Sequence, residues 1–357
     1  MYHEPRFGSW VLTRFDDVYG VLRDHETFSS ARGISPGING GGGTLMITSD
    51  PPRHTHLRGV VNKAFTPQRV AALRPRIQQI VDELLAGVGN ESVDAVALLT
   101  YPLPVIVIAG LLGIPPTDRE RFKRWSSAVV GFTDTGMRGD NTLAVMEMMQ
   151  YFAGVIAQRR TALGDDLISA IVAATIDGER LSDRELLAFC LLLLVAGNET
   201  TTNLIGNMLN VLVERPDLWT ALRDNRALVP AAVEETLRYD SPVLLLWRTA
   251  TRPVEIRGTP IAENEKVMVV YAAANRDPDA FPEPDEFRLD RGLSRHVAFG
   301  YGIHYCLGAP LARLEAEVAL NELLDRFARV ERGDGPGERL GSGILRGFKR
   351  LPLRFLV

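Results

Sequence analysis

The sequence predicts a mainly helical protein with a small β portion. Apolar residues recur every three or four positions through most of its 357 residues, which is typical of helices with one buried face. The segment from Arg248 to Tyr271 instead alternates β-branched and polar residues around turns at Gly258 and Pro260, which indicates short strands. No internal repeat and no linker divides the chain. We therefore expect one domain over residues 1–357.

The N-terminal part predicts a short strand over Trp10 to Arg14 and a helix over Asp16 to Asp24. Ser29 to Asp50 is rich in Gly, Ser and Pro, with consecutive glycines from Gly40 to Gly43, so we expect a mobile loop without regular structure. This loop is not a phosphate cradle, because no Gly-Lys-Ser/Thr follows it.

After this loop the helical period returns and continues almost to the C-terminus. The predicted helices cover Pro52–Ala64, Pro67–Gly87, Thr100–Leu112, Asp118–Val130, Asn141–Leu163, Asp166–Thr175, Ser182–Val213, Pro216–Arg223, Val229–Tyr239 and Pro310–Phe327.

Composition and charge give no reason to propose nucleic-acid or membrane binding. The net charge is −4, with 46% hydrophobic and 24% charged residues, which is ordinary for a soluble globular protein. Met1 to Trp10 has no apolar signal core. The longest apolar run, Leu186 to Gly197, is shorter than the about 20 residues that span a bilayer. There are two cysteines, and if Cys306 is a ligand no disulfide is available, so we expect a cytoplasmic protein.

Cys306 is the most informative residue. It stands in the run Phe299 to Gly308, called here the cysteine loop, directly before an apolar helical stretch. A cysteine at that place has its sulfur near unpaired N–H groups, which favour a thiolate, while Gly302 and Gly308 allow a tight turn and the close approach of a flat ligand. Such a thiolate suits a soft metal, of which haem iron is one candidate. The alternative is a small buried cysteine after a glycine turn.

The whole cysteine loop resembles the haem-binding signature of cytochromes P-450. The positions that match it are Phe299, Gly300, Gly302, His304, Cys306 and Gly308. The resemblance implies the fold of that family, with haem b (iron protoporphyrin IX) between a long distal helix and the helix after the cysteine loop. It also implies that Cys306 is the iron ligand, with Phe299, Gly300, His304 and Gly308 among the residues around the haem.

A second pattern lies in the middle of a long apolar helix, at Ala196-Gly197-Asn198-Glu199-Thr200. A buried carboxylate and hydroxyl are costly there unless they are hydrogen-bonded. Gly197 weakens the helix and frees space beside it, and Thr200 can bond back into the helix; the alternative is a solvated kink. The run resembles the distal-helix pattern of the family, which implies that Ala196 and Gly197 border the haem. It also implies that Glu199 and Thr200 deliver protons to bound O₂.

Glu235 and Arg238 are three residues apart on one predicted helix, a spacing that by default is an ordinary surface ion pair. They resemble the Glu-x-x-Arg of the family, whose role is structural. The stretch Asn275–Pro278, followed by Phe281, Phe287 and Arg291, resembles the segment that packs against that pair.

His54 and Arg58 are four residues apart and share a helix face. His54 and His56 point to different sides, so a zinc site is not expected; the alternative is a basic, solvated helix start. The resemblance assigns His54, Arg58, Arg248 and His304 to the haem propionates, since carboxylates in an apolar cleft need cationic or hydrogen-bonding partners.

The resemblance implies a haem-thiolate monooxygenase that uses O₂ and electrons to hydroxylate a lipophilic small molecule, such as a terpenoid, steroid, fatty acid or polyketide. The chain has no flavin, nicotinamide or iron–sulfur motif. Electrons from NAD(P)H must therefore arrive through external redox proteins, which we expect to be a ferredoxin and its reductase. An acidic partner of this kind could be steered by basic residues, for which the candidates are Arg53, Arg58, Arg69, Arg295 and Arg313.

Two alternatives stay open, a peroxide-driven haem-thiolate oxygenase and a non-enzymatic haem sensor. The candidate substrate-pocket residues are apolar and could equally be core; they are Leu45, Met46, Leu193, Val243, Leu244, Leu246 and Trp247, together with Ala196. Relative to the family the chain starts late, which leads us to expect an altered N-terminal edge of the pocket.

Overall fold

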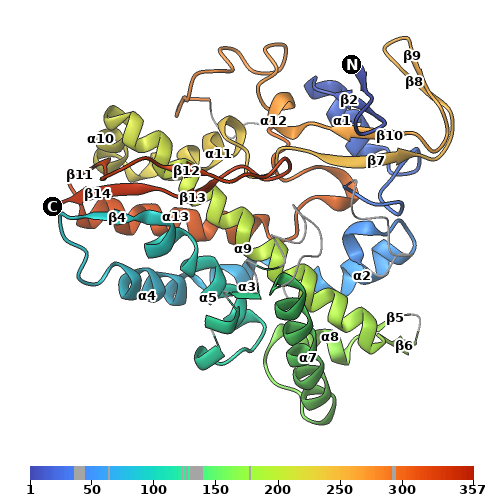
Figure 1. Ribbon diagram of the computed structural model, residues 1–357, viewed down its shortest axis with the longest axis horizontal. Helices are drawn as coiled ribbons and strands as arrows, with labels where there is room; N and C mark the ends of the chain where they lie inside the picture. The colour runs from blue at the N-terminus through green and yellow to red at the C-terminus, as the bar shows by residue number, and fades with distance from the viewer. Residues whose placement is uncertain are drawn as a thin grey trace.

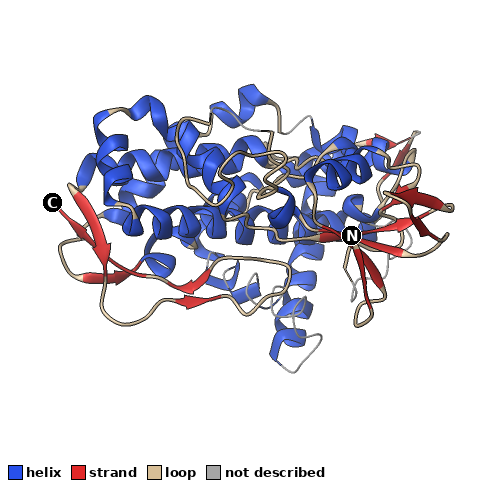
Figure 2. Ribbon diagram, turned by 90° about the horizontal axis from the view of Figure 1, so that it is seen from above, coloured by secondary structure: helices blue, strands red, loops and turns tan. Residues whose placement is uncertain are grey.

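The computed structural model describes residues 1–35, 45–62, 65–118, 120–122, 124–125, 128, 140–176, 178–291 and 295–357. Over these ranges the helices form the middle of the molecule, and strands gather at its two ends (Figure 2). The N-terminus lies with one group of strands and the C-terminus with the other (Figure 1). The structure is therefore mainly helical with a small β portion, as the sequence predicts.

The described helices follow the predicted ranges closely. Their bounds are α1 Phe15–Arg23, α2 Arg53–Asn62, α3 Pro67–Ala71, α4 Arg74–Leu85, α5 Pro102–Leu111, α7 Asp140–Thr161, α8 Leu167–Ala173, α9 Asp183–Glu214, α10 Pro216–Asp224, α11 Val229–Tyr239, α12 Tyr271–Ala274 and α13 Ala309–Arg326. Short helical turns lie at η1 Met46–Thr48, η2 Val96–Thr100, η3 Pro116–Asp118, η4 Arg226–Leu228 and η5 Gly302–His304.

Two predicted segments differ from the observed elements. The helix expected over Pro67–Gly87 is divided into α3 and α4, because Pro75 stands at the start of α4, where a residue without an N–H is tolerated. The helix expected over Asp118–Val130 lies only partly within the described residues, and Gly40 to Gly43 of the predicted mobile loop lie outside them.

The larger sheet has five strands in the order β1-β2-β10-β7-β3. Strand β10 runs parallel to β2 and antiparallel to β7. The bounds are β1 Tyr2–Glu4, β2 Ser9–Leu12, β3 Phe28–Ser29, β7 Leu246–Ala250 and β10 Lys266–Val269. The predicted strands at Arg248 to Tyr271 thus join three from the N-terminal part and place Arg248 on an interior strand of the sheet.

The sequence analysis missed the sheets near the C-terminus. A three-stranded sheet has the order β11-β14-β4, and the remaining strands form two-stranded pairs. Their bounds are β4 Ser92–Asp94, β5 Thr175–Ile176, β6 Glu179–Arg180, β8 Val254–Ile256, β9 Thr259–Ile261, β11 Arg329–Arg332, β12 Glu338–Arg339, β13 Phe348–Arg350 and β14 Pro352–Leu356. Of these, β8 and β9 pair with each other inside the predicted strand segment around Gly258. The other strands are short, and β4 pairs with β14 across a long sequence distance, so no local alternation predicts them.

Helix α9 crosses the centre of the molecule and packs against α5, α7, α11 and α13 (Figure 1). A capping box begins it, in which Ser182 and Glu185 bond each other's backbone N–H groups. Within the described residues α9 is the one helix long and apolar enough to cross a membrane, and 65% of its most apolar window is buried in the fold. The contact with α13 brings the predicted distal helix beside the helix that follows the cysteine loop.

Candidate active site

The cysteine loop has a backbone that requires glycine at two positions. Gly300 and Gly302 have φ angles of 68° and 70°, in the left-handed region that side chains disfavour. A Cβ on Gly302 would also lie 2.4 Å from the carbonyl oxygen of Leu22, at the end of α1. The Cys306 N–H donates to the Phe299 carbonyl at 2.9 Å and closes the loop.

Gly308 differs from these glycines. It precedes α13 with an ordinary φ of −81°, and a Cβ there would meet nothing within 4 Å. The expected turn is therefore made at Gly300 and Gly302, whereas Gly308 keeps the surface next to Cys306 free of a side chain. This second property fits the approach of a flat ligand.

Burial raises the pKa of the Cys306 thiol, and the N–H groups of Gly308 and Ala309 and the charge of Arg58 oppose that rise. The sulfur thus lies at the start of α13, as the sequence predicts, but burial outweighs the donors. A metal cation bound to the sulfur would reverse this balance, because coordination deprotonates a thiol outright.

His54 and His304 meet next to the cysteine loop, with ring centroids 4.4 Å apart. The Nε2 atoms of both rings are buried and have no hydrogen-bond partner among the described residues. Burial and the nearby Arg58 lower the pKa of His54 to about 4. Burial and the charge of Arg248 lower the pKa of His304 to about 2. Neutral imidazoles beside two guanidinium groups form a buried positive site that an anion would balance.

Arg58 and Arg248 reach this site from different parts of the chain. Arg58, on α2, donates from Nη2 to the Tyr305 carbonyl at 2.6 Å. Arg248, on β7, is buried and donates to the Trp247 carbonyl at 2.8 Å. The structure therefore brings together the predicted propionate-binding residues of α2, β7 and the cysteine loop. Two haem carboxylates match the charge and the unused ring nitrogens found there.

The distal run lies mid-way along α9. Ala196 is exposed although α9 is a core helix, and the Thr200 hydroxyl donates to the Ala196 carbonyl at 2.9 Å. Glu199 is buried and interacts with neighbouring groups. The side-chain position of Gly197 faces α5, where a Cβ would lie 3.1 Å from Cδ1 of Ile108. Gly197 thus permits close packing of α5 and α9, which corrects the expectation that it leaves free space beside the helix.

Glu235 and Arg238 form a buried ion pair, with exposed side-chain fractions of 2% and 0%. Two hydrogen bonds of 2.7 and 2.8 Å join them. The Arg238 guanidinium also donates to three carbonyls, those of Asn275, Pro284 and Glu286. Arg291 donates to Glu235 at 2.9 Å. The default reading as a surface pair is therefore wrong, and the pair holds the segment before the cysteine loop.

The apolar candidates divide between the two faces of β7. Leu246 shares a face with Arg248, because side chains alternate along a strand. Trp247 points the other way, packs with Val11 and Met268, and donates from Nε1 to the Ser9 hydroxyl at 3.1 Å. Trp247 therefore lies on the opposite face of β7 from Arg248, in a small core cluster of its own, and its contact with substrate stays a prediction.

The other pocket candidates lie in three places. Met46 and Leu193 are buried in the main core. Leu45 is half-buried just before η1. Val243 and Leu244 lie ahead of β7, where Leu244 donates its N–H to the Ile344 carbonyl at 2.8 Å. These positions leave Leu45, Val243, Leu244 and Leu246 as partly accessible apolar candidates.

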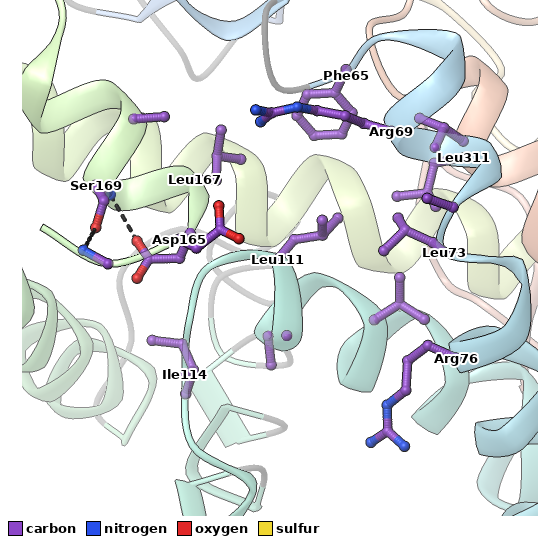
Figure 3. Close-up of a pocket in the computed structure, with 18 of the residues that line it drawn as sticks. Phe65, Arg69, Leu73, Arg76, Leu111, Ile114, Asp165, Leu167, Ser169 and Leu311 are labelled. Carbon is purple, nitrogen blue, oxygen red and sulfur yellow. Dashed lines mark hydrogen bonds between the residues drawn. The ribbon is translucent and has the colours of Figure 1, made fainter.

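A cavity of about 820 Å³ opens elsewhere, between α3, α4, α5 and α8 (Figure 3). Figure 3 shows Phe65, Arg69 and Leu73 on one side of it and Leu111 and Ile114 on another. Its lining contains neither Cys306 nor any residue of the distal run or the positive site. Volume alone therefore does not identify the catalytic cleft.

Two of the basic residues expected to steer a redox partner form ion pairs within the chain. Arg53 forms an ion pair with Glu185, and Arg313 pairs with Glu234. The sequence analysis did not predict the role of Glu234. Its position directly before Glu235, the first residue of the Glu-x-x-Arg pattern, was a usable signal.

A half-buried thiol at a helix start, a positive site beside it and an accessible helix face are the features expected of a haem-thiolate protein. The family model described as "Cytochrome P450" matches residues 126–346, and the chain belongs to that family. It is a P450 monooxygenase of the bacterial type.

Curated relatives resemble nearly the whole chain. Cytochrome P450 107B1 of Saccharopolyspora erythraea is 41% identical over 97% of this chain and 89% of its own. Erythromycin C-12 hydroxylase of the same organism is 42% identical over 98% and 90%.

Solved structures confirm the predicted P450 fold. A mutant of P450 EryK in complex with erythromycin B has a TM-score of 0.91 at 40% identity, covering 99% of this chain and 92% of that one. CYP109E1 from Bacillus megaterium in complex with testosterone has a TM-score of 0.89 at 38% identity, covering 100% and 96%.

Proposed function

We propose that this monooxygenase is a single catalytic domain that holds haem b between α9 and α13, with the Cys306 sulfur as iron ligand. The observation that carries the proposal is the buried positive site, in which the His54 and His304 Nε2 atoms, next to Arg58 and Arg248, have no hydrogen-bond partner in the part of the chain that the structure describes. A dianionic cofactor would satisfy those atoms and neutralise the charge. When bound, haem supplies oxygen activation, which an electron-rich thiolate ligand favours.

The roles of the surrounding residues follow from their positions. His54, Arg58, Arg248 and His304 would hold the propionates. Phe299, Gly300 and Gly308 would form the wall on the cysteine side, and Ala196 with the backbone at Gly197 the wall on the α9 side. Excluding water between these walls would prevent uncontrolled proton transfer from solvent, so that protons arrive only through protein groups.

Glu199 and Thr200 are proposed to pass protons into the site. The Thr200 hydroxyl donates to Ala196 within its own helix, so its oxygen remains able to accept a hydrogen bond. Glu199 directly precedes Thr200 and is buried, and it can exchange a proton with solvent as its neighbours rearrange. The pair therefore suits O₂ chemistry, whereas a peroxide-driven enzyme brings its protons with the oxidant.

The substrate is proposed to be a polycyclic or macrocyclic compound. One relative's name specifies erythromycin C-12 hydroxylation, and similar structures hold erythromycin B or testosterone. The partly accessible Leu45, Val243, Leu244 and Leu246 would meet such an apolar body. A titration of macrolides, steroids and fatty acids, followed by the shift of the Soret band, would rank these classes.

Electrons are proposed to come from NAD(P)H through a ferredoxin and its reductase in the cytoplasm, because the sequence holds no second redox motif. Comparing product formation with NAD(P)H and these proteins against product formation with peroxide alone tests this route.

The test of the central proposal is Cys306→Ser. The reduced carbon monoxide complex of the unmodified protein should show the long-wavelength Soret band of a thiolate ligand, and the variant should lose it. Persistence of the band in Cys306→Ser would refute the assignment.

A further inference from the structure

The carboxylate of Glu234 lies where the two ends of the cysteine loop come together. Glu234 is on α11, and its side chain is 9% exposed. It binds His296, which precedes the cysteine loop, and Arg313, which follows it on α13. The neighbouring Glu235 serves a different network, so the two adjacent glutamates hold two different segments.

The contact with Arg313 is bidentate. Arg313 donates from Nε to Oε1 of Glu234 at 2.5 Å and from Nη2 to Oε2 at 2.9 Å. Parallel bonds of this kind fix the plane of the guanidinium group as well as its position.

Arg313 in turn contacts two residues of the cysteine loop. Its Nη1 donates to the hydroxyl of Tyr305 at 3.2 Å, and Tyr305 directly precedes Cys306. Its guanidinium carbon lies 4.6 Å from the centroid of the Phe299 ring, within the range of a cation–π contact. Since Phe299 also accepts the N–H of Cys306, one guanidinium supports both sides of the loop.

The contact with His296 fixes the approach to the loop. The Nδ1 atom of His296 accepts the N–H of Ala298 at 3.2 Å, so in the neutral ring the proton is on Nε2. That nitrogen lies 3.1 Å from Oε2 of Glu234 and donates to it. Burial opposes ionisation of Glu234, but the bonds from His296 and Arg313 prevail and lower its pKa to about 2. The carboxylate is therefore charged.

We propose that Glu234 is a positioning residue for Cys306. It holds the Arg313 guanidinium against Phe299 and Tyr305, and so fixes both the cysteine loop and one positive charge beside the sulfur. This inference rests on the proposed role of Cys306 as iron ligand and deepens it. It also assigns Arg313 to the interior architecture of the site rather than to the steering of an acidic partner.

Glu234→Gln, Arg313→Gln and the double variant test the proposal in the haem-loaded protein. One measurement is the temperature at which the reduced carbon monoxide complex loses its long-wavelength Soret band. Each single variant should lower that temperature, and the double variant should be little worse than the worse single one, because both changes break one interaction. Arg313→Lys keeps the positive charge but cannot make the two parallel hydrogen bonds, so it should lower that temperature by an intermediate amount.

The second measurement is the reduction potential of the iron. Glu234→Gln leaves the guanidinium charge unbalanced and should shift the potential upward, whereas Arg313→Gln removes that charge and should shift it downward. Simple loosening of the loop does not predict opposite signs.

Glu317→Gln is the matched control. Glu317 lies on α13, as Arg313 does, and forms a partly exposed ion pair with Arg74 at 3.2 Å. It should change neither measurement. The proposal would be overturned if the double variant lowered the temperature of band loss by the sum of the two single effects. It would also be overturned if the two single variants failed to shift the reduction potential in opposite directions. If Glu234→Gln yields no haem-loaded protein, His296→Gln and Arg313→Lys provide the same comparison.

Failure of the proposed function would look different. In that case the unmodified protein would lack the long-wavelength band, or Cys306→Ser would keep it.

Discussion

His54 and His304 lie edge to face, with ring centroids 4.4 Å apart and an interplanar angle of 63°. One ring belongs to α2 and the other to the cysteine loop, and neither Nε2 atom has a partner among the described residues. The contact joins two parts of the chain that are far apart in sequence. It marks the place where haem carboxylates are proposed to bind.

We expect His54→Ala to lose haem faster than the unmodified protein. A hydrogen bond to a charged group contributes about 1.5–3 kcal/mol, which corresponds to roughly ten- to hundredfold in affinity. Transfer of haem to an excess of a haem-scavenging apoprotein measures the rate. His56→Ala is the matched control, because His56 lies on a different side of α2; equal rates for the two variants would contradict the assignment.

Arg238→Ala should destabilise the protein severely. Removing one partner of a buried ion pair leaves an uncompensated charge and costs about 3–5 kcal/mol. The midpoint of denaturant unfolding should fall accordingly. Arg257→Ala breaks the pair with Asp17, in which Arg257 is 48% exposed, and should lower the midpoint little, because exposed ion pairs contribute little to stability. Similar losses in the two variants would count against a structural role for the buried pair.

Thr200→Ala should affect coupling more than binding. The hydroxyl lies next to the proposed acid Glu199, where protons are needed after O₂ binds, whereas its removal takes away little apolar contact. We expect severalfold less product and more peroxide per NAD(P)H consumed, with unchanged substrate-induced spectra. Thr202→Ala, which removes a hydroxyl bonded to Asn198 on the same helix, serves as control. An unchanged product yield in Thr200→Ala would exclude the relay.

Glu315 gives the protein a stability that depends on pH. Burial raises the pKa of this carboxyl well above 4.5, so the folded state keeps a proton that the unfolded state releases. Stability from this group is full below about pH 4.5. It then falls as pH rises toward the folded-state pKa, by about 1.4 kcal/mol per unit.

Glu315→Gln should therefore stabilise the protein at neutral pH relative to acid pH and flatten this part of the profile. Denaturant unfolding at several values between about pH 5 and pH 8 measures how the free energy of unfolding changes as this carboxyl titrates. Glu317→Gln, at the partly exposed pair with Arg74, should leave the slope unchanged. A profile for Glu315→Gln that parallels the unmodified protein would disprove the account.

The sequence predicted most of the helices because each has a long apolar face of its own. It also named Cys306, His54, Arg58, Arg248 and His304 as cofactor-binding candidates, and their roles stay predictions. What it could not supply depends on contacts across the fold. That Trp247 and Arg248 point to opposite faces of β7 became clear only once the strand was located. The partners of Glu234 lie on elements far along the chain.

The short C-terminal strands escaped prediction for the same reason. Strand β4, at Ser92–Asp94, pairs with β14, at Pro352–Leu356, so neither strand carries enough local pattern to be recognised without its partner.

Gly302 touches the end of α1 so closely that a Cβ would overlap the Leu22 carbonyl oxygen. The shape of the cysteine loop thus depends on a segment that lies far earlier in the chain. A contact across so many residues closes a long loop, which costs conformational entropy that the local contacts of a helix do not require. The outline of the pocket for the prosthetic group is therefore set jointly by two distant parts of the chain.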